Sequence, residues 1–358
     1  MSDRFLLVGV LALTLLCYFA HEWFNRLPPV IPASFQNQFS GERAIDLTRR
    51  LLGDESPHPV GSPENREVRK RIQTWLDEQG IAHEVQRTWG CSQAWGRCAI
   101  AENVIATIPG QRDGPHVALM AHYDSVPPAP GAGDNAIAVA TMMEVGRLIK
   151  SAGELVNPLT LLLVDAEEQG LIGAEAFFAR HRLRDQIGVL VNLEGSVNPG
   201  RTILFRTSGP NRGTLRLFGG APHVAGSSHQ NEIFNHMAVD TDFAVPKRHG
   251  VTGIDFGKVG NRSLSHTRLD TTARLHGPSI QFMGDNIYHV ARELVHADLE
   301  NLPEGRDAYG NLYGLWLQWP VGFNLVLVAI AFIALAITSG RRCEACLTHP
   351  SCRWACSS

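Results

Sequence analysis

The sequence predicts an α/β fold with a mainly parallel, mixed central sheet flanked by helices. Between residues 103 and 195, short apolar runs alternate with longer helical patterns. This spacing is typical of crossover units, in which each helix connects two parallel strands. The functional crevice of such a sheet lies beyond the carboxyl ends of its strands, so chemistry is expected there.

Each element of this fold has its own segment of sequence. Helical patterns cover residues 43–52, 65–79, about 135–151, about 173–182 and about 279–299. The expected strands are NVIATIP (103–109), HVALMAH (116–122), LTLLLVDA (159–166) and VLVNLEG (189–195). Residues 201–260 contain scattered Gly and Pro and are less regular, so no element is assigned there.

Length and charge exclude several classes of protein. The 358 residues include 32 Lys+Arg and 35 Asp+Glu, which gives a net charge of −3. A protein that neutralises nucleic-acid phosphates would be markedly more basic. A disordered chain would be much poorer than 44% in hydrophobic residues. We therefore expect a folded chain with no nucleic-acid partner, as one large domain or two ordinary ones.

Two uncharged apolar runs predict a transmembrane helix at each end and hence a lipid bilayer as partner. Residues 5–20 are interpreted as an uncleaved anchor, because no small-x-small cleavage site follows them. Residues 321–338 follow Trp316 and Trp319 and precede Arg341 and Arg342, a pattern typical of a spanning helix. The expected organisation is an anchor (1–26), a Pro-rich linker (27–40), a main domain (41–310), a second span (315–340) and a Cys-rich tail (341–358).

The basic pair after the second run predicts the topology. Arg341 and Arg342 favour the cytoplasmic side, so the main domain would face the lumen, the periplasm or the exterior. A short-loop disulfide between Cys91 and Cys98 is plausible if that compartment is oxidising. The tail cysteines have the spacing C-x2-C-x5-C-x3-C and could hold zinc, or the tail could lack fixed structure.

Carboxylates and imidazoles follow three successive apolar runs and recur in two loops. In chain order they are His122 and Asp124 (HYDS), Asp134 (GAGDN), Glu167 and Glu168 (DAEEQG), Glu194 (LEG) and His266 (SLSHTRLDT). Mixed His/Asp/Glu ligation with an open water position is typical of catalytic zinc. Of two adjacent glutamates, one can bind metal while the other accepts a proton from water. Helix capping or loop solvation could explain any one of these acidic residues, but it explains the whole ordered set poorly.

These motifs resemble the family of co-catalytic zinc aminopeptidases, which also contains glutamate carboxypeptidases. The motifs HYDS, GAGDNA, DAEEQGLIGAEAF, NLEG and SHTRLDT occur in the order expected of that family. The likeness covers roughly residues 40–300. It is greatest to the membrane-anchored branch typified by endoplasmic-reticulum metallopeptidase and the vacuolar membrane protease. SPHPVGSPEN (56–65) and TDFAVPKRHGVTGIDF (241–256) also resemble that branch.

The resemblance implies a zinc peptidase domain over residues 41–310, with two zinc ions per chain. Asp124 would hydrogen-bond His122 from behind, and Glu167 would be the general base. The ligands would be His122 and Glu194 for one zinc, Glu168 and His266 for the other, and Asp134 as the bridge between them. Gly133 stands where many soluble relatives carry a second acid, and we expect this difference to leave the metal count unchanged.

The implied activity is peptide-bond hydrolysis by a membrane-anchored exopeptidase. An aminopeptidase is favoured over a carboxypeptidase, because the motifs lack a basic cluster beyond Arg206, Arg212 and Arg268. The alternatives are a glutaminyl cyclase with one zinc and a catalytically inert peptidase-like binding ectodomain. Two hypotheses of lesser weight assign His58 to a local turn, and Asp242 and Asp270 to orienting His266 or contacting substrate.

Overall fold

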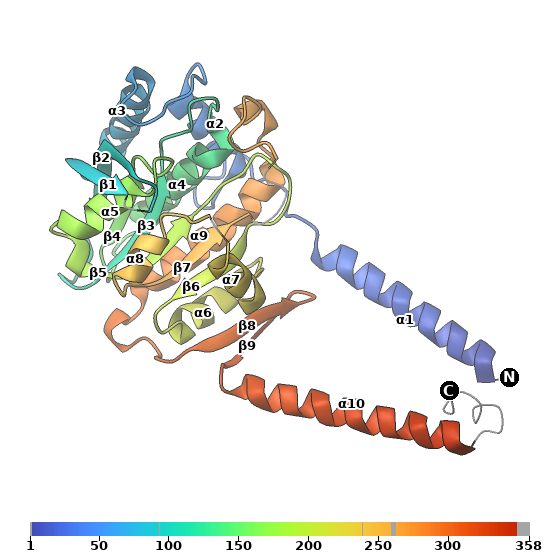
Figure 1. Ribbon diagram of the computed structural model, residues 1–358. Coiled ribbons are helices and arrows are strands. Elements are labelled where there is room, and N and C mark those ends of the chain that lie inside the picture. Colours follow the sequence, from blue (N-terminus) through green and yellow to red (C-terminus); the bar gives the residue numbers. More distant parts are fainter. Residues whose placement is uncertain (1, 93, 238, 259–262, 349–358) are drawn as a thin grey trace.

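A mixed seven-stranded sheet forms the centre of the computed structural model, which describes residues 2–92, 94–237, 239–258 and 263–348. The strand order is β1-β2-β4-β3-β5-β7-β6 (Figure 1). The four central strands, β4 (Leu159–Val164), β3 (His116–His122), β5 (Ile187–Leu193) and β7 (Thr252–Gly257), are parallel. The outer strands β1 (Ala82–Ser92), β2 (Arg97–Ile108) and β6 (Ile203–Ser208) pair antiparallel. The expected mixed α/β fold is confirmed.

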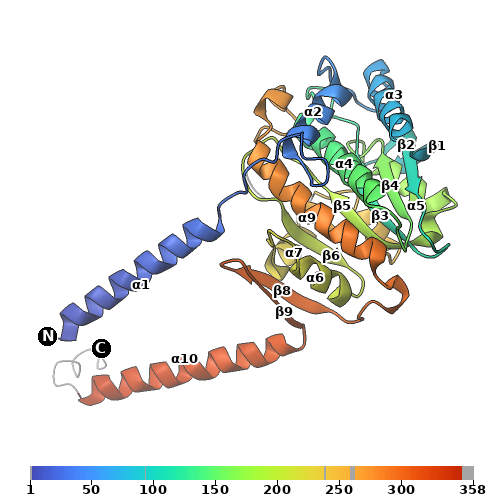
Figure 2. The same cartoon turned by 180° about the vertical axis from the view of Figure 1, so that it is seen from behind.

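Helices cover both faces of the sheet, and β3 shows why. Its residues alternate between two apolar cores, with Leu119 and Ala121 in one and Ala118 and Met120 in the other. The first core also contains residues of α2 (Gly41–Leu52), α3 (Pro63–Glu78), α4 (Ile137–Ala152), α6 (Arg212–Gly219) and α9 (Gly277–His296). The second contains residues of α5 (Ile172–Arg180) and α8 (Ala244–Arg248). Figure 2 shows α4 and α9 side by side across the first face.

The structure adds elements that the sequence pattern did not reveal. Strand β1 lies at the sheet edge and carries mostly half-exposed polar residues, so it lacks the apolar run that marks a buried strand. Strands β6 and β7 are largely buried, but Arg206 in β6 and Gly253 and Asp255 in β7 interrupt their apolar runs. The sequence pattern therefore does not mark them as buried strands. Further additions are α6, α7 (Ser228–Asn235), α8, and a hairpin of β8 (Asp307–Leu312) and β9 (Leu315–Pro320).

Two long helices leave the main body, α1 (Ser2–Phe24) and α10 (Phe323–Thr348). Both project from the same side of the body in the two opposite views (Figures 1 and 2). Within the described residues, α1 is long and apolar enough to cross a membrane over Leu7–Phe24. The apolar part of α10, Phe323–Ser339, is shorter. Of the two expected spanning helices, the structure therefore provides one candidate, at the amino end, and the second span stays a prediction.

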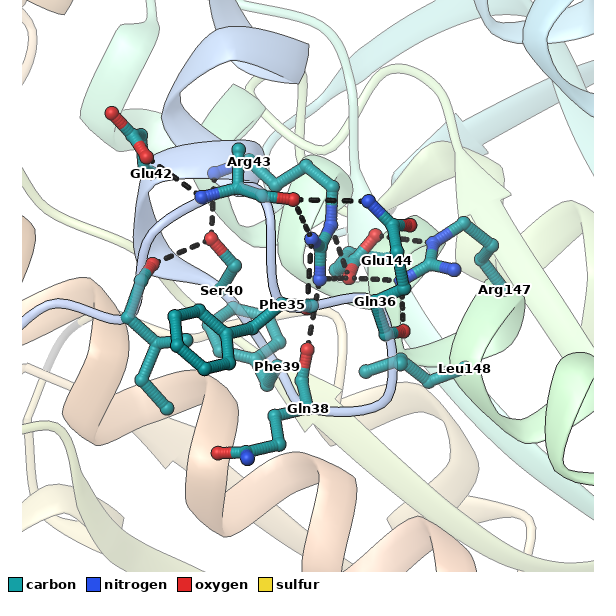
Figure 3. Close-up of polar contacts among 12 residues, drawn as sticks. Phe35, Gln36, Gln38, Phe39, Ser40, Glu42, Arg43, Glu144, Arg147 and Leu148 are labelled. Carbon is teal, nitrogen blue, oxygen red and sulfur yellow. Dashed lines mark hydrogen bonds and ion pairs between the residues drawn. The ribbon is translucent and has the colours of Figure 1, made fainter.

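The Pro-rich segment after α1 is held against the body. Arg43 donates hydrogen bonds to the backbone oxygens of Ala33, Phe35 and Gln38 and pairs with Glu144 on α4 (Figure 3). Arg147 pairs with the same glutamate, whose side chain is only 3% exposed. A single buried carboxylate thus joins this segment to the helix beside the sheet.

The change Glu144→Ala is expected to loosen this junction. Removing one partner of a mostly buried ion pair leaves uncompensated charge, and partial exposure of both arginines reduces the cost to about 2–3 kcal/mol of unfolding free energy. Chymotrypsin cleavage after the exposed Phe35 should become faster. The control Glu64→Gln changes an exposed acid in the first turn of α3, away from this segment, and this variant should be cut at nearly the original rate. Equal cleavage of Glu144→Ala and the unaltered chain would contradict this role.

The structure tests one of the two predictions made for the cysteines. Cys91 and Cys98 form a disulfide that closes the β1–β2 turn, as expected. The zinc site considered for the tail requires Cys352 and Cys356, which lie outside the described residues.

Candidate metal centre

Three neighbouring parallel strands deliver the predicted side chains to one edge of the sheet. His122 is the last residue of β3, Glu167 and Glu168 follow β4, and Glu194 follows β5. Since β4, β3 and β5 are adjacent and parallel, their carboxyl ends meet. The periodicity that placed three apolar runs ahead of these residues therefore places their functional groups together.

The remaining predicted ligands come from loops beside this edge. Asp134 lies in a short turn, η1 (Ala132–Ala136), immediately before α4. His266 lies between β7 and α9 in a left-handed backbone conformation, with φ of 59°. His122, Asp134 and Glu194 are buried, whereas the His266 side chain is 52% exposed. The site therefore has a buried wall and an open side.

The side chains form two groups that share Asp134. In the first group, His122 Nε2 lies 3.4 Å from Asp134 Oδ1 and 3.7 Å from Glu194 Oε2. In the second, His266 Nε2 lies 3.3 Å from Asp134 Oδ2 and 3.1 Å from Glu168 Oε1. The two oxygens of one carboxylate thus face two different imidazoles.

These distances fit ligands of zinc. Two tetrahedral ligands that each lie 2.0–2.2 Å from one ion are separated by roughly 3.3–3.6 Å. The separations in both groups are close to this value, and each group has one imidazole and two carboxylates. The residues present therefore fit zinc at this cluster.

His122 is oriented by Asp124. The His122 Nδ1 atom lies 3.1 Å from the backbone oxygen of Asp124 and 3.4 Å from its Oδ1. With Nδ1 protonated, Nε2 presents its lone pair to Asp134 and Glu194, as a metal ligand requires. Asp124 also accepts hydrogen bonds from the backbone N–H groups of Glu167 and Glu168, at 3.0 and 3.2 Å. One carboxylate thus fixes both the imidazole and the pair of glutamates.

Other buried groups hold the loops, and sequence reasoning assigned them no such role. Asp270 accepts hydrogen bonds from the backbone N–H groups of Gly133 and Asp134, at 2.7 and 3.1 Å. Its role is therefore to fix the turn that carries Asp134. A Cβ atom at Gly133 would lie 2.3 Å from the backbone nitrogen of Val197, so this close packing requires glycine.

Two asparagines orient Glu194. The Asn135 side chain donates to Glu194 Oε2 at 3.2 Å, and Asn192 donates to Oε1 at 3.3 Å. Asn135 follows Asp134 directly, and Asn192 lies on β5. The signal that could have identified them is their position: both are amides beside predicted ligands at the edge of the sheet.

Excess negative charge dominates the electrostatics of the site. Burial raises the pKa of Glu167 well above its ordinary value, and the carboxylates of Asp242, Glu168 and Glu194 add to this rise while His122 opposes it. Hydrogen bonds to Asp134 and Glu168 raise the pKa of His266 to about 10. Several carboxylates facing two imidazoles favour a bound cation.

Two hypotheses of lesser weight have different outcomes. The Asp242 carboxylate is fully buried, and burial raises its pKa well above the ordinary range. No hydrogen bond or ion pair joins it to His266 within the described ranges. His58 is buried, and its backbone N–H donates to Ser125 Oγ at 2.9 Å, next to the loop that carries Asp124. This contact agrees with a local structural role.

An open cavity of about 590 Å³ leads to the cluster. Its lining includes Trp95 and Arg97, which lie between the disulfide-bonded Cys91 and Cys98 in the sequence, and Met237, Val239 and Asp240. Glu167 lines the cavity together with the metal-site carboxylates. The cluster is thus reachable by a substrate.

Comparison with known proteins assigns the family. A model of peptidase family M28 matches residues 103–291, just over half of the chain. The chain belongs to peptidase family M28. The resemblance read from the sequence motifs is confirmed. The matched region of the M28 family contains all seven predicted site residues.

Relatives named as membrane or endoplasmic-reticulum proteases match most of the chain. The human endoplasmic reticulum metallopeptidase 1 is 29% identical over 87% of this chain, and the mouse protein is 33% identical over 74%. The vacuolar membrane protease of Eremothecium gossypii is 31% identical over 66%. The matches cover 37%, 32% and 24% of those proteins, so the chain spans about a third or less of their length.

Solved structures share the fold of this M28 chain. An aminopeptidase from Aneurinibacillus sp. strain AM-1 has a TM-score of 0.61 at 15% identity, covering 76% of this chain and 97% of that one. A glutaminyl cyclase from an Acidobacteriales bacterium has a TM-score of 0.59 at 20% identity, covering 75% and 99%. At these identities the likeness concerns the fold.

Proposed function

We propose that this chain is a membrane-anchored, zinc-dependent exopeptidase that uses two zinc ions and removes amino-terminal residues from peptides. The observation that carries the proposal is the sharing of Asp134 between the group of His122 and Glu194 and the group of Glu168 and His266. Retention of ligands in both groups supports two ions over the single ion of a cyclase-type site. Metal analysis combined with peptide hydrolysis tests the proposal directly.

The zinc ions, when bound, would supply the Lewis acidity that lowers the pKa of water and polarises a peptide carbonyl. Glu167 is assigned as the general base, because its carboxylate lines the cavity and lies beside His122 and Glu168. It accepts a proton from the attacking water and later delivers a proton to the leaving amine. Asp124 is a positioning residue, because it holds the backbone of Glu167 through a 3.0 Å hydrogen bond.

Charge around the cavity favours a free amino end over a carboxylate as the recognised group. Two of the three arginines considered for carboxylate binding are already paired: Arg206 with Asp255 and Asp240, and Arg212 with Asp307. Asp240 lines the cavity, and its side chain is 41% exposed. Its Oδ1 accepts from Arg206, which also pairs with Asp255, so one positive charge serves two carboxylates. Asp240 therefore keeps negative charge to offer to a substrate ammonium group.

The change Asp240→Asn is expected to lower kcat/KM for peptides with a free amino end by about 10- to 100-fold. A hydrogen bond to a charged group contributes about 1.5–3 kcal/mol, and the variant loses this contact mainly as a higher KM. Steady-state kinetics on a free peptide and its acetylated counterpart measure the change. Discrimination between the two substrates should fall with it.

The matched control is Arg97→Gln, which removes the arginine that lines the same cavity. Amino-end recognition predicts little change in KM for this variant. If Arg97→Gln raised KM strongly while Asp240→Asn had no effect, carboxyl-end cleavage would replace the amino-end assignment.

The membrane arrangement belongs to the same proposal. The domains are an anchor over 1–26, a linker over 27–40, a zinc peptidase domain over 41–310, a second span over 315–340 and a Cys-rich tail over 341–358. The basic pair after the second span supports a peptidase domain on the lumenal, periplasmic or extracellular side. The disulfide between Cys91 and Cys98 agrees with an oxidising compartment.

A further inference from the structure

The β8–β9 hairpin has one face packed on the body and one face turned away from it. On the inner face, the ring of Trp316 packs against Phe218 and Tyr309, with centroids 5.0 and 5.5 Å apart. Gln318 donates to Asp307 and to the backbone oxygen of Arg212. These contacts fix the hairpin as a firm part of the folded domain.

The outer face of the hairpin is apolar and exposed. Leu315 and Leu317 alternate with the inward side chains of β9 and are 61% and 38% exposed. Leu312 is the cross-strand partner of Leu315 and is 57% exposed. Because directly paired residues of antiparallel strands share a face, these leucines form one patch. Exposed two-stranded edges in water usually carry charges, and this hairpin has none after Asp307.

Each of the two long helices has one end beside this hairpin. The Phe24 ring at the end of α1 lies 6.3 Å from the ring of Tyr313 at the hairpin tip. At the hairpin base, the backbone N–H of Val321 donates to Arg306 just before α10. Figures 1 and 2 both show the tip directed towards α1 and the base joined to α10. The hairpin therefore spans the interval between the two helices.

The sequence around the hairpin has the composition of a membrane interface. No charged residue occurs between Asp307 and Arg341, so the uncharged hairpin is continuous with the apolar helix. Tyr313 and Trp319 lie at its tip and base, and such aromatic residues are enriched at the level of lipid headgroups. Arg26 and Arg306, both exposed, lie where the chain leaves this region and can meet phosphate groups.

We infer that the outer face of the β8–β9 hairpin is a lipid-binding surface that lies in the interface of the bilayer. Leu312, Leu315 and Leu317 insert into it, while Trp316 and Gln318 keep the hairpin attached to the peptidase domain. Since α1 and α10 flank the hairpin, the domain then contacts the bilayer at three places: the two helices and the outer face of the hairpin. Three contacts fix the tilt of the domain relative to the membrane, whereas the two helices alone would leave the tilt free. This surface is independent of the catalytic assignment.

The experiment adds one tryptophan at a time to the full chain reconstituted in phosphatidylcholine vesicles whose acyl chains carry bromine. The variants are Leu315→Trp on the outer face, Leu13→Trp in α1 as the insertion control, and Ile100→Trp, an exposed apolar site on β2. The emission of each added tryptophan is obtained by subtracting the fluorescence of the unaltered chain from that of the variant. Bromine quenches tryptophans that contact the acyl chains.

The expected result is loss of most of the added emission for Leu315→Trp and Leu13→Trp, with no loss for Ile100→Trp. Quenching at residue 13 without quenching at residue 315 would overturn the lipid-binding surface. In that case, a blue-shifted emission that depends on protein density would assign the face to a second copy of the chain, and quenching by iodide would assign it to water. Absence of quenching at residue 13 would remove the membrane premise and the inference with it.

Discussion

Replacing Glu167 with glutamine is expected to lower kcat for peptide hydrolysis on the order of 10³-fold, while the bound zinc is retained. Glutamine matches the shape of the side chain but cannot accept a proton from water. The backbone of residue 167 stays tied to Asp124, so the ligands keep their places. Turnover of an aminoacyl substrate and metal content of the same preparation measure the two effects.

The adjacent glutamate provides the matched control. Glu168 lies 3.1 Å from the His266 ring, so Glu168→Gln should weaken one metal site and lose zinc together with activity. A loss of turnover with full metal in Glu167→Gln, and with reduced metal in Glu168→Gln, would separate base from ligand. Near-normal turnover of Glu167→Gln would refute the assigned base.

The change Asp134→Asn is expected to reduce metal binding more than Glu167→Gln or Glu168→Gln. Asp134 is the carboxylate that faces both His122 and His266, and an amide provides neither the charge nor the second anionic oxygen. The variant should hold at most one zinc per chain and hydrolyse peptides at background level. Its fold should persist, because Asp270 bonds the backbone N–H of residue 134, which the substitution leaves in place. Metal analysis after dialysis, together with thermal unfolding, measures both.

The control for Asp134→Asn is Asp113→Asn, which removes one negative charge from an exposed loop outside the cluster. This variant should keep full zinc content and activity. If Asp134→Asn retained two zinc ions, Asp134 could not be the shared ligand, and the two groups would have to bind independently.

The sequence predicted the part of the site that follows directly from strand order. His122, Glu167, Glu168 and Glu194 each follow an apolar run, and neighbouring parallel strands must bring their carboxyl ends to one edge. The structure places all four within this edge, and it adds Asp134 and His266 from the loops that the family resemblance indicated. The metal-binding roles themselves stay proposals until metal is measured.

The supporting groups could not be predicted because their roles depend on loop geometry. Asp270 bonds a turn that is more than a hundred residues away in sequence, and no local pattern encodes that contact. Asn192 lies on a buried strand, where a polar residue would normally argue against burial. Scattered Gly and Pro leave residues 201–260 without a recognisable pattern. The structure shows two strands there, β6 and β7, whose charged residues Arg206 and Asp255 are buried and pair with each other.

The hairpin shows a further limit of pattern reading. The sequence assigned Trp316 and Trp319 together to a membrane interface, but Trp316 packs inward against Phe218. Alternation along β9 separates the two faces, and this alternation is visible only once the segment is known to be a strand.

The central claim is tested most directly by measuring zinc content and peptide hydrolysis on the purified full chain. Equilibrium with excess zinc and removal of free ion should leave about two zinc ions per chain, as the shared Asp134 requires. The same preparation should cleave peptides with a free amino end, and acetylation of that end should abolish cleavage. A chain that binds no zinc and hydrolyses neither peptide would contradict the account and make this domain a binding ectodomain.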